Sequence, residues 1–92
     1  MLEIFYTAKF KKDFKRLKRQ GKDMSKLSEV LQMIASGAPL PESKRDHLLS
    51  GSYKNHRECR IEPDWLLIYR IEESELVLTA TRTGSHSELF DS

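Results

Sequence analysis

The apolar residues near the start of the chain recur first at every second position and then at every third or fourth. The alternation over residues 2–6 fits a short strand with one face on the core. The wider spacing that follows forms one stripe of a helix that ends near Gly21, and Thr7 offers a hydroxyl to cap its start. The stripe consists of Phe10, Phe14 and Leu17. The chain therefore opens with a predicted strand and an amphipathic helix.

A second amphipathic helix is predicted after Asp23, whose carboxylate can cap the first free amides. Its apolar stripe continues to Ser36 and Gly37 and consists of Met24, Leu27, Val30, Leu31 and Ile34. The prolines within residues 38–41 stop this helix, because proline lacks an amide hydrogen and clashes with the preceding turn. The two helices are expected to form an antiparallel hairpin, followed by an irregular connection over residues 42–52.

Three segments in the second half of the chain have the composition of strands. They span residues 53–61, 65–72 and 76–82 and are joined by a Pro-Asp turn and a Glu-Ser turn. The middle segment is apolar on both of its alternating faces, which is typical of a central strand. The order β-α-α-β-β-β predicts one α+β domain over residues 1–92: an N-terminal strand, the helix hairpin and a three-stranded antiparallel meander form one sheet with the helices packed on one face. Leu89 and Phe90 are expected to pack back onto this sheet.

Composition narrows the class of protein. With 38% hydrophobic and 33% charged residues, the chain has the balance of a soluble globular protein, and its apolar run at residues 65–69 is far shorter than the ~20 residues of a membrane span. The first residues lack the apolar stretch of a signal peptide, and the single Cys59 cannot form an internal disulfide. We therefore expect a cytoplasmic protein.

The positive charge is concentrated near the start of the chain. Nine of the sixteen Lys and Arg residues lie between Lys9 and Lys26, whereas only Arg82 follows Glu72. Such a basic region attracts phosphates or an acidic protein segment, and its alternative interpretation is an ordinary solvated helix face. A nucleic acid or an acidic protein is therefore the predicted kind of partner.

Candidate groups for acid-base chemistry gather in the second half of the chain. Cleavage of RNA without a metal requires a group that takes a proton from a ribose 2′-hydroxyl, a cation at the phosphate, and a group that protonates the leaving 5′-oxygen. Histidine suits proton transfer near neutral pH, and arginine binds two phosphate oxygens at once. The chain offers His47, His56 and His86, the carboxylates Asp46, Glu58 and Asp64, and the cations Arg57, Arg60 and Arg82. The alternative for each is a surface strand decorated with ion pairs.

Strand spacing brings some of these groups together. Glu58 and Arg60 are two positions apart and share one face of a strand, with His56 if that strand is regular. Arg57 then points toward the core side, where it fits only near a sheet edge. The dispersed histidines and the single Cys59 lack the ligand spacing of a zinc site, so no metal or other cofactor is expected.

Four short motifs occur in a characteristic order. They are Asp46-His47, Leu49-x-Gly51-Ser52-Tyr53, Glu62-Pro63-Asp64-Trp65 followed by Leu66-Leu67-Ile68-Tyr69, and Arg82-Thr83-Gly84-Ser85-His86 followed by Leu89-Phe90. Together they resemble the YafQ branch of the RelE/ParE toxin superfamily over nearly the full chain. The resemblance implies the toxin of a type II toxin-antitoxin system: a ribosome-dependent, metal-free mRNA endoribonuclease (mRNA interferase) that produces a 2′,3′-cyclic phosphate and inhibits translation. The alternatives are a ParE-like toxin that acts by binding, without nuclease activity, and a plain RNA-binding module.

The resemblance also implies roles for the candidate catalytic residues. His86 would donate a proton to the leaving oxygen, His47 would transfer a proton or bind phosphate, and Asp64 would act as a base or orient another group. The chain departs from the family pattern at two positions, with Glu58 in place of an aspartate and Arg60 in place of a histidine. Arg60 can clamp the scissile phosphate but is a poor base. Which of Glu58, Asp64 and His47 is the base stays open.

RNA contacts and partners follow from the same resemblance. Phe90 is implied as a platform for a base, with a core anchor of the tail as the alternative. The remaining candidates for RNA contact are Arg82, Lys54, Lys11 and Lys15. The implied partners are mRNA, the ribosomal A site and an acidic antitoxin, partly disordered when free, in a toxin-antitoxin heterotetramer; a membrane is not among them. The sequence assigns no role to His56 or Cys59 and no codon preference.

Overall fold

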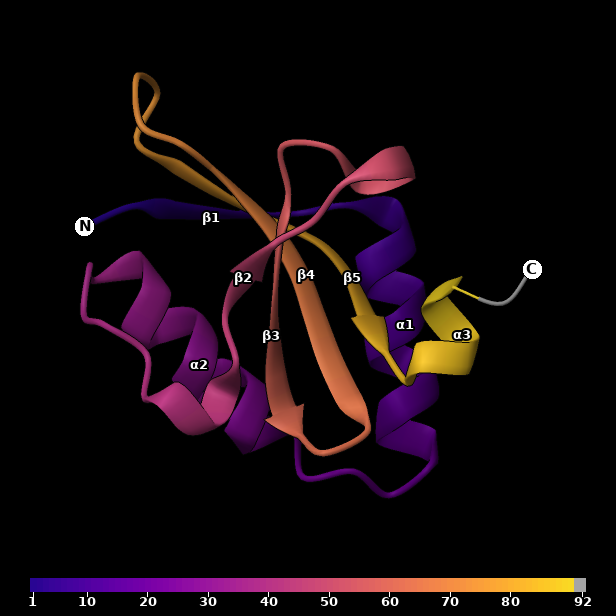
Figure 1. The fold of residues 1–92 in the computed structure, drawn as a ribbon. Coiled ribbons are helices and arrows are strands. Elements are labelled where there is room, and N and C mark those ends of the chain that lie inside the picture. Colours follow the sequence, from indigo (N-terminus) through magenta and orange to yellow (C-terminus); the bar gives the residue numbers. More distant parts are fainter. Residues whose placement is uncertain (91–92) are drawn as a thin grey trace.

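The computed structural model describes residues 1–90, so Asp91 and Ser92 of the predicted domain lie outside the described residues. The helices are α1 (Ala8–Arg19), α2 (Met24–Ala35) and α3 (His86–Phe90). The strands are β1 (Glu3–Tyr6), β2 (His47–Leu48), β3 (Arg57–Glu62), β4 (Trp65–Glu72) and β5 (Val77–Gly84). Short 3₁₀ turns, η1 (Glu42–Lys44) and η2 (Gly51–Tyr53), lie on either side of β2. The predicted α+β class and element order are confirmed (Figure 1).

One five-stranded sheet holds the domain together, with the strand order β1-β5-β4-β3-β2. The strands β3, β4 and β5 form the predicted antiparallel meander, and β1 pairs with β5 in parallel. Parallel pairing requires a long crossover, and the chain between β1 and β5 supplies it. The first and last strands of the sequence therefore lie side by side in the sheet.

The helices α1 and α2 cover one face of the sheet, as predicted. Thr7 Oγ1 accepts a hydrogen bond from the Phe10 amide at 3.0 Å, and Asp23 Oδ1 accepts one from the Ser25 amide at 3.1 Å, so both predicted N-caps are present. The apolar stripes of both helices pack against alternate residues of β3, β4 and β5. The buried sheet residues of this layer are Cys59, Ile61, Trp65, Leu67, Tyr69, Leu78 and Ala80.

The opposite face of the sheet carries a smaller apolar layer. Leu66 and Ile68 of β4 pack against Leu89 of α3, with Leu49 and Tyr53 partly buried beside them. The central strand is thus apolar on both faces, and Leu89 packs back onto the sheet, as expected. Because α3 lies on this second face, it borders the sheet surface that α1 and α2 leave open.

The first strand of the meander begins later than predicted. Residues 51–53 form the turn η2, and β3 starts at Arg57. Asn55 has a φ of +68°, a left-handed conformation that asparagine tolerates and that interrupts an extended strand. His56 therefore lies outside the strand, and β2 arises within the segment that we expected to be irregular.

Two buried residues have purely structural surroundings. Burial raises the pKa of the Cys59 thiol to about 12, so this cysteine is an inert core residue rather than a nucleophile. The Trp65 indole lies in the core, and its Nε1 donates a hydrogen bond to Thr83 Oγ1 at 2.9 Å.

Across residues 1–90, the helices are too short and too polar to cross a lipid bilayer.

Candidate active site

Strand pairing aligns several candidate residues in one row across the sheet. His47 of β2 pairs with Glu58 of β3, Glu58 pairs with Ile68 of β4, and Ile68 pairs with Arg82 of β5. Directly paired residues point to the same side of a sheet. Ile68 belongs to the layer under α3, so the charged members of this row lie on the face that α1 and α2 leave open.

A cleft of about 530 Å³ opens on this face. Its lining residues are Arg45, Asp46, His47, Glu58, Cys59, Arg60, Leu66 and His86. The cleft thus collects four of the predicted catalytic residues: His47 from β2, Glu58 and Arg60 from β3, and His86 from the start of α3. Asp64, the remaining one, does not line the cleft but contacts His86, which does. The shared face of Glu58 and Arg60 agrees with the strand-spacing argument.

His47 and Glu58 form the first of two histidine-carboxylate pairs. The His47 Nδ1 lies 2.6 Å from the carbonyl oxygen of Arg45, and its Nε2 lies 3.4 Å from Glu58 Oε1. The Arg45 carbonyl and the Glu58 carboxylate thus orient the imidazole ring from its two nitrogen edges. The His47 side chain is 53% exposed, whereas that of Glu58 is 7% exposed. The histidine is therefore the member of the pair that a substrate can reach.

Asp46 anchors the segment that carries His47. Its Oδ1 accepts a hydrogen bond from the Tyr69 hydroxyl at 2.5 Å, and its Oδ2 accepts one from Arg57 Nε at 3.2 Å. Burial, with help from Asp46, raises the pKa of the Tyr69 phenol, which keeps that phenol as a donor. Arg57 lies at the start of β3, one strand in from the edge strand β2, and the expected misfit on the core side is avoided because Asp46 pairs with its guanidinium. Asp46 therefore fixes the backbone next to His47.

Asp64 and His86 form the second pair. Asp64 Oδ1 accepts a hydrogen bond from the His86 backbone amide at 3.2 Å and lies 3.5 Å from His86 Nδ1. The side chains are 73% and 59% exposed, so solvent screens their attraction, and such pairs contribute under ~1 kcal/mol. The hydrogen bond from the backbone amide is therefore the contact that fixes the start of α3. Asp64 thus holds the first residue of α3, beyond its place in the Pro-Asp turn.

An aromatic surface adjoins the second pair. The Phe90 ring lies 5.9 Å from the Tyr53 ring and 6.0 Å from the His86 ring, measured between centroids. Phe90 is 44% exposed, so its ring is not a buried anchor of the tail, and the neighbouring Leu89 fills that place. Tyr53 belongs to a quoted motif, but its sequence position alone did not indicate this contact. An exposed ring beside an imidazole suits stacking with a nucleobase.

The other RNA-binding candidates are dispersed. Lys11 and Lys15 line an apolar groove of about 440 Å³ between α1 and α2, the helices that cover the other face of the sheet. Lys54 is exposed and directly follows η2. Arg82 points to the open face, yet its Nε and Nη2 already donate to Asp13 Oδ2 and Oδ1 at 2.7 and 3.1 Å. The structure therefore brings Arg82, but neither Lys11 nor Lys15, close to the row of catalytic candidates.

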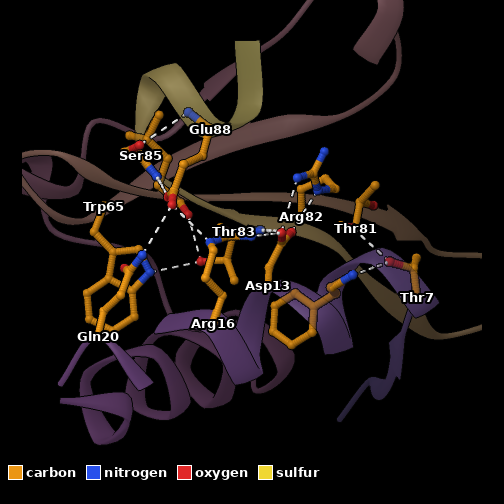
Figure 2. A network of polar contacts seen from close by, with 12 residues as sticks. Thr7, Asp13, Arg16, Gln20, Trp65, Thr81, Arg82, Thr83, Ser85 and Glu88 are labelled. Carbon is orange, nitrogen blue, oxygen red and sulfur yellow. Dashed lines mark hydrogen bonds and ion pairs between the residues drawn. The ribbon is translucent and has the colours of Figure 1, made fainter. Parts of the chain in front are cut away.

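Asp13 was not identified by the sequence patterns, although it falls within the apolar stripe of α1. It is 2% exposed and, besides Arg82, accepts hydrogen bonds from Arg16 Nη1 at 2.8 Å and from the Thr83 amide at 3.2 Å (Figure 2). The pairing of β1 with β5 ends at Ala80, so no residue of β1 pairs with Thr83. The Asp13 carboxylate accepts the hydrogen bond of the Thr83 amide instead. Burial alone would raise the pKa of the Asp13 carboxyl, but the hydrogen bonds from Arg82, Arg16 and Thr83 outweigh it and hold that pKa below its ordinary value.

This lowered pKa predicts how stability depends on pH. A carboxyl whose pKa is lower in the folded than in the unfolded state binds fewer protons when folded. Its stabilisation is complete above the unfolded pKa of about 4 and is lost as the pH falls through the folded value. We expect the free energy of unfolding to fall between pH 5 and pH 3 and to fall less steeply in Asp13→Asn. Urea unfolding at each pH measures both slopes, and equal slopes would contradict the assignment.

The fold and the site together define a small α+β domain whose sheet carries a candidate acid-base site on its open face, with two histidine-carboxylate pairs and Arg60. Within residues 1–90, no group of three or more His, Cys, Asp or Glu side chains could hold a metal ion. The family model for the bacterial toxin of the type II toxin-antitoxin system, YafQ, matches residues 2–91. The chain belongs to the YafQ family.

Similar proteins cover nearly the same length. The mRNA interferase toxin YafQ of Escherichia coli (strain K12) is 38% identical over 89 residues, which are 96% of this chain and 95% of that protein. The crystal structure of a metal-bound toxin from Helicobacter pylori is 44% identical, with a TM-score of 0.92, and covers 98% of this chain and 100% of that one. A chain of the E. coli DinJ-YafQ complex is 38% identical, with a TM-score of 0.86, over 98% and 99% of the two chains.

Proposed function

We propose that this toxin is an mRNA endoribonuclease that inhibits translation by cutting mRNA. The observation that carries the proposal is the presence of two exposed histidines, each paired with a carboxylate, at one cleft that also holds an arginine. The E. coli relative is named an mRNA interferase toxin, which supports the same activity here. A toxin that acts only by binding would have no need of this arrangement.

The reaction is attack of a ribose 2′-oxygen on the adjacent phosphorus. The O2′–P bond forms and the P–O5′ bond breaks, leaving a 2′,3′-cyclic phosphate and a 5′-hydroxyl. One group must accept the 2′-hydroxyl proton and another must protonate the leaving 5′-oxygen. We assign the first task to the His47–Glu58 pair and the second to His86, which Asp64 orients.

The exposures of the three base candidates support this division. The Glu58 carboxylate lies behind His47, and its Oε2 is buried without a hydrogen-bond partner among the described residues. His47 is the exposed member of the pair, so its imidazole is the group that can accept the proton of the ribose hydroxyl, while the buried Glu58 carboxylate orients the ring. Asp64 contacts His86 instead and belongs to the donor side.

Arg60 would neutralise the charge that grows on the phosphate. Its side chain lines the cleft, and it takes part in no ion pair with the described residues. A guanidinium can bind two phosphate oxygens, and a positioned donor of this kind contributes about 10²- to 10³-fold to the rate. The arginine at this position thus supplies charge stabilisation where the family pattern has a histidine.

Partners follow from the same proposal. The E. coli relative forms a complex with DinJ, and we infer an acidic, partly disordered antitoxin for this chain, in a heterotetramer. The lysines of α1, including Lys11 and Lys15, would contact ribosomal RNA on the side of the domain away from the cleft. The mRNA would then enter the cleft within the ribosomal A site, with Phe90 and Lys54 beside the nucleotides. This places the toxin in the cytoplasm.

A reconstituted translation reaction tests the activity. We expect site-specific mRNA cuts that require ribosomes, survive a chelator and end in a 2′,3′-cyclic phosphate. In single-turnover reactions, Arg60→Ala should lower the rate constant of cleavage by about 10²- to 10³-fold, with a smaller loss in Arg60→Lys. Arg70→Ala, which removes a half-buried arginine paired with Glu72 outside the cleft, is the matched control and should cut normally. Inhibited translation without any cut would favour a toxin that acts by binding.

A further inference from the structure

The short helix α3 carries His86 but has little stability of its own. It spans five residues, far below the ~12 that an isolated helix needs, and Leu89 is its one buried residue. The place of His86 in the cleft must therefore depend on side-chain contacts that reach α3 from elsewhere. These contacts come largely from α1 (Figure 2).

A capping box closes the start of α3. The Ser85 amide donates to Glu88 Oε1 at 2.8 Å, and the Glu88 amide donates to Ser85 Oγ at 3.2 Å. The same Glu88 carboxylate is held by α1: its Oε2 lies 2.9 Å from Arg16 Nε and 3.5 Å from the donor Gln20 Nε2. Glu88, the residue that caps α3, thus also contacts side chains of α1, which lies on the other face of the sheet.

Arg16 connects this cap to the rest of the network. Its Nη1 donates to Asp13 Oδ1 at 2.8 Å and its Nη2 to the Thr83 carbonyl oxygen at 3.3 Å. The backbone passes closely against these groups, because a Cβ at Gly84 would lie 2.8 Å from Arg16 Nη2 and 2.9 Å from Glu88 Oε1. One guanidinium therefore binds α1, the end of β5 and the cap of α3, which a lysine ammonium cannot reproduce.

We propose that Arg16 is a positioning residue for the nuclease: it seats α3 through Glu88 and so holds His86 at the cleft. The inference rests on the proposed function. Loss of Arg16 would free the first turn of α3, and catalysis is sensitive to displacements of about 1 Å in an acid-base group. Arg16 itself does not line the cleft, so RNA binding should be unaffected.

The test compares Arg16→Ala and Arg16→Lys with the unaltered chain, using Arg70→Ala as a control that breaks another arginine-glutamate pair. We expect kcat to fall about 10- to 100-fold in Arg16→Ala, with KM within twofold and a smaller loss in Arg16→Lys. Amide hydrogen exchange gives an independent readout, because the Leu89 amide donates to the Ser85 carbonyl within α3. Its exchange should accelerate at least tenfold in Arg16→Ala, while amides of the buried strand β4 keep their protection.

Several outcomes decide the proposal. An unchanged kcat, unchanged Leu89 exchange, or a rise in KM without loss of kcat would overturn it, the last by making Arg16 an RNA contact. Faster exchange in β4 as well would indicate general destabilisation, and Glu88→Gln then decides, because it keeps a capping oxygen and removes only the charge facing Arg16. If the unaltered chain cut no RNA, the proposed function would fail, while Leu89 exchange would still show whether Arg16 seats α3.

Discussion

His86→Ala is expected to cut mRNA about 10²- to 10⁴-fold more slowly than the unaltered toxin, the range that a positioned general acid contributes. The leaving 5′-oxygen would have to depart without a proton, and no other imidazole adjoins Asp64 in the described structure. Because the His86 side chain is 59% exposed, its removal should leave the folded domain intact. The rate of cleavage in a reconstituted translation reaction measures the effect, and thermal unfolding checks the fold.

His56→Ala provides the matched control. This histidine lies outside the cleft, where its Nδ1 contacts the Lys54 carbonyl oxygen at 3.1 Å, and its loss should leave cleavage unchanged. A substrate with a better leaving group at the 5′-oxygen should recover activity in His86→Ala, since it no longer needs a proton donor. Equal rates for His86→Ala and the unaltered chain would remove His86 from the mechanism.

Most helices and strands could be predicted from the sequence because the patterns that indicate them are local. Apolar spacing and caps placed α1, α2 and β4 within a residue or two. Pairing in space had no such signal: the parallel contact of β1 with β5 depends on how the helix hairpin packs, and β2 forms only because β3 lies beside it. The late start of β3 follows from the left-handed Asn55, which strand propensity does not register.

The same division applies to the site. Glu58 and Arg60 could be placed on one face because their spacing within a strand determines it. The contact of His47 with Glu58 requires β2, and the contact of Asp64 with His86 joins a turn to a helix far along the chain, so neither pairing could be predicted from spacing. Motif resemblance named these residues without saying which carboxylate serves which histidine.

Asp13 shows a signal that sequence analysis can use. It is one acid within a helix rich in lysine and arginine, and it lies on the apolar stripe between Phe10 and Leu17. A carboxylate directed toward a core must find hydrogen-bond donors there. In this fold the donors are the open edge of β5 and two arginines. An acid on a buried stripe therefore predicts a buried polar network before its partners are known.

Removal of that carboxylate should cause a large loss of stability in the domain. Asp13→Ala leaves Arg82, 18% exposed, without its counter-ion, and it leaves the Thr83 amide without an acceptor. Breaking a buried ion pair by removing one partner costs about 3–5 kcal/mol. We expect the free energy of unfolding, measured by urea titration, to fall by this amount with an unchanged m-value. For a domain of this size, that loss approaches the whole stability.

Asp23→Ala is the matched control, because it removes an aspartate of the same helix hairpin that caps α2 at the surface. Loss of a fully exposed N-cap removes one solvated hydrogen bond, so Asp13→Ala should be clearly more destabilising than Asp23→Ala. Asp13→Asn should fall between them, since an amide oxygen still accepts from Thr83 but no longer balances the arginines. If Asp13→Ala were no more destabilising than Asp23→Ala, solvent would have to reach Arg82, and Asp13 would not hold β5 against α1.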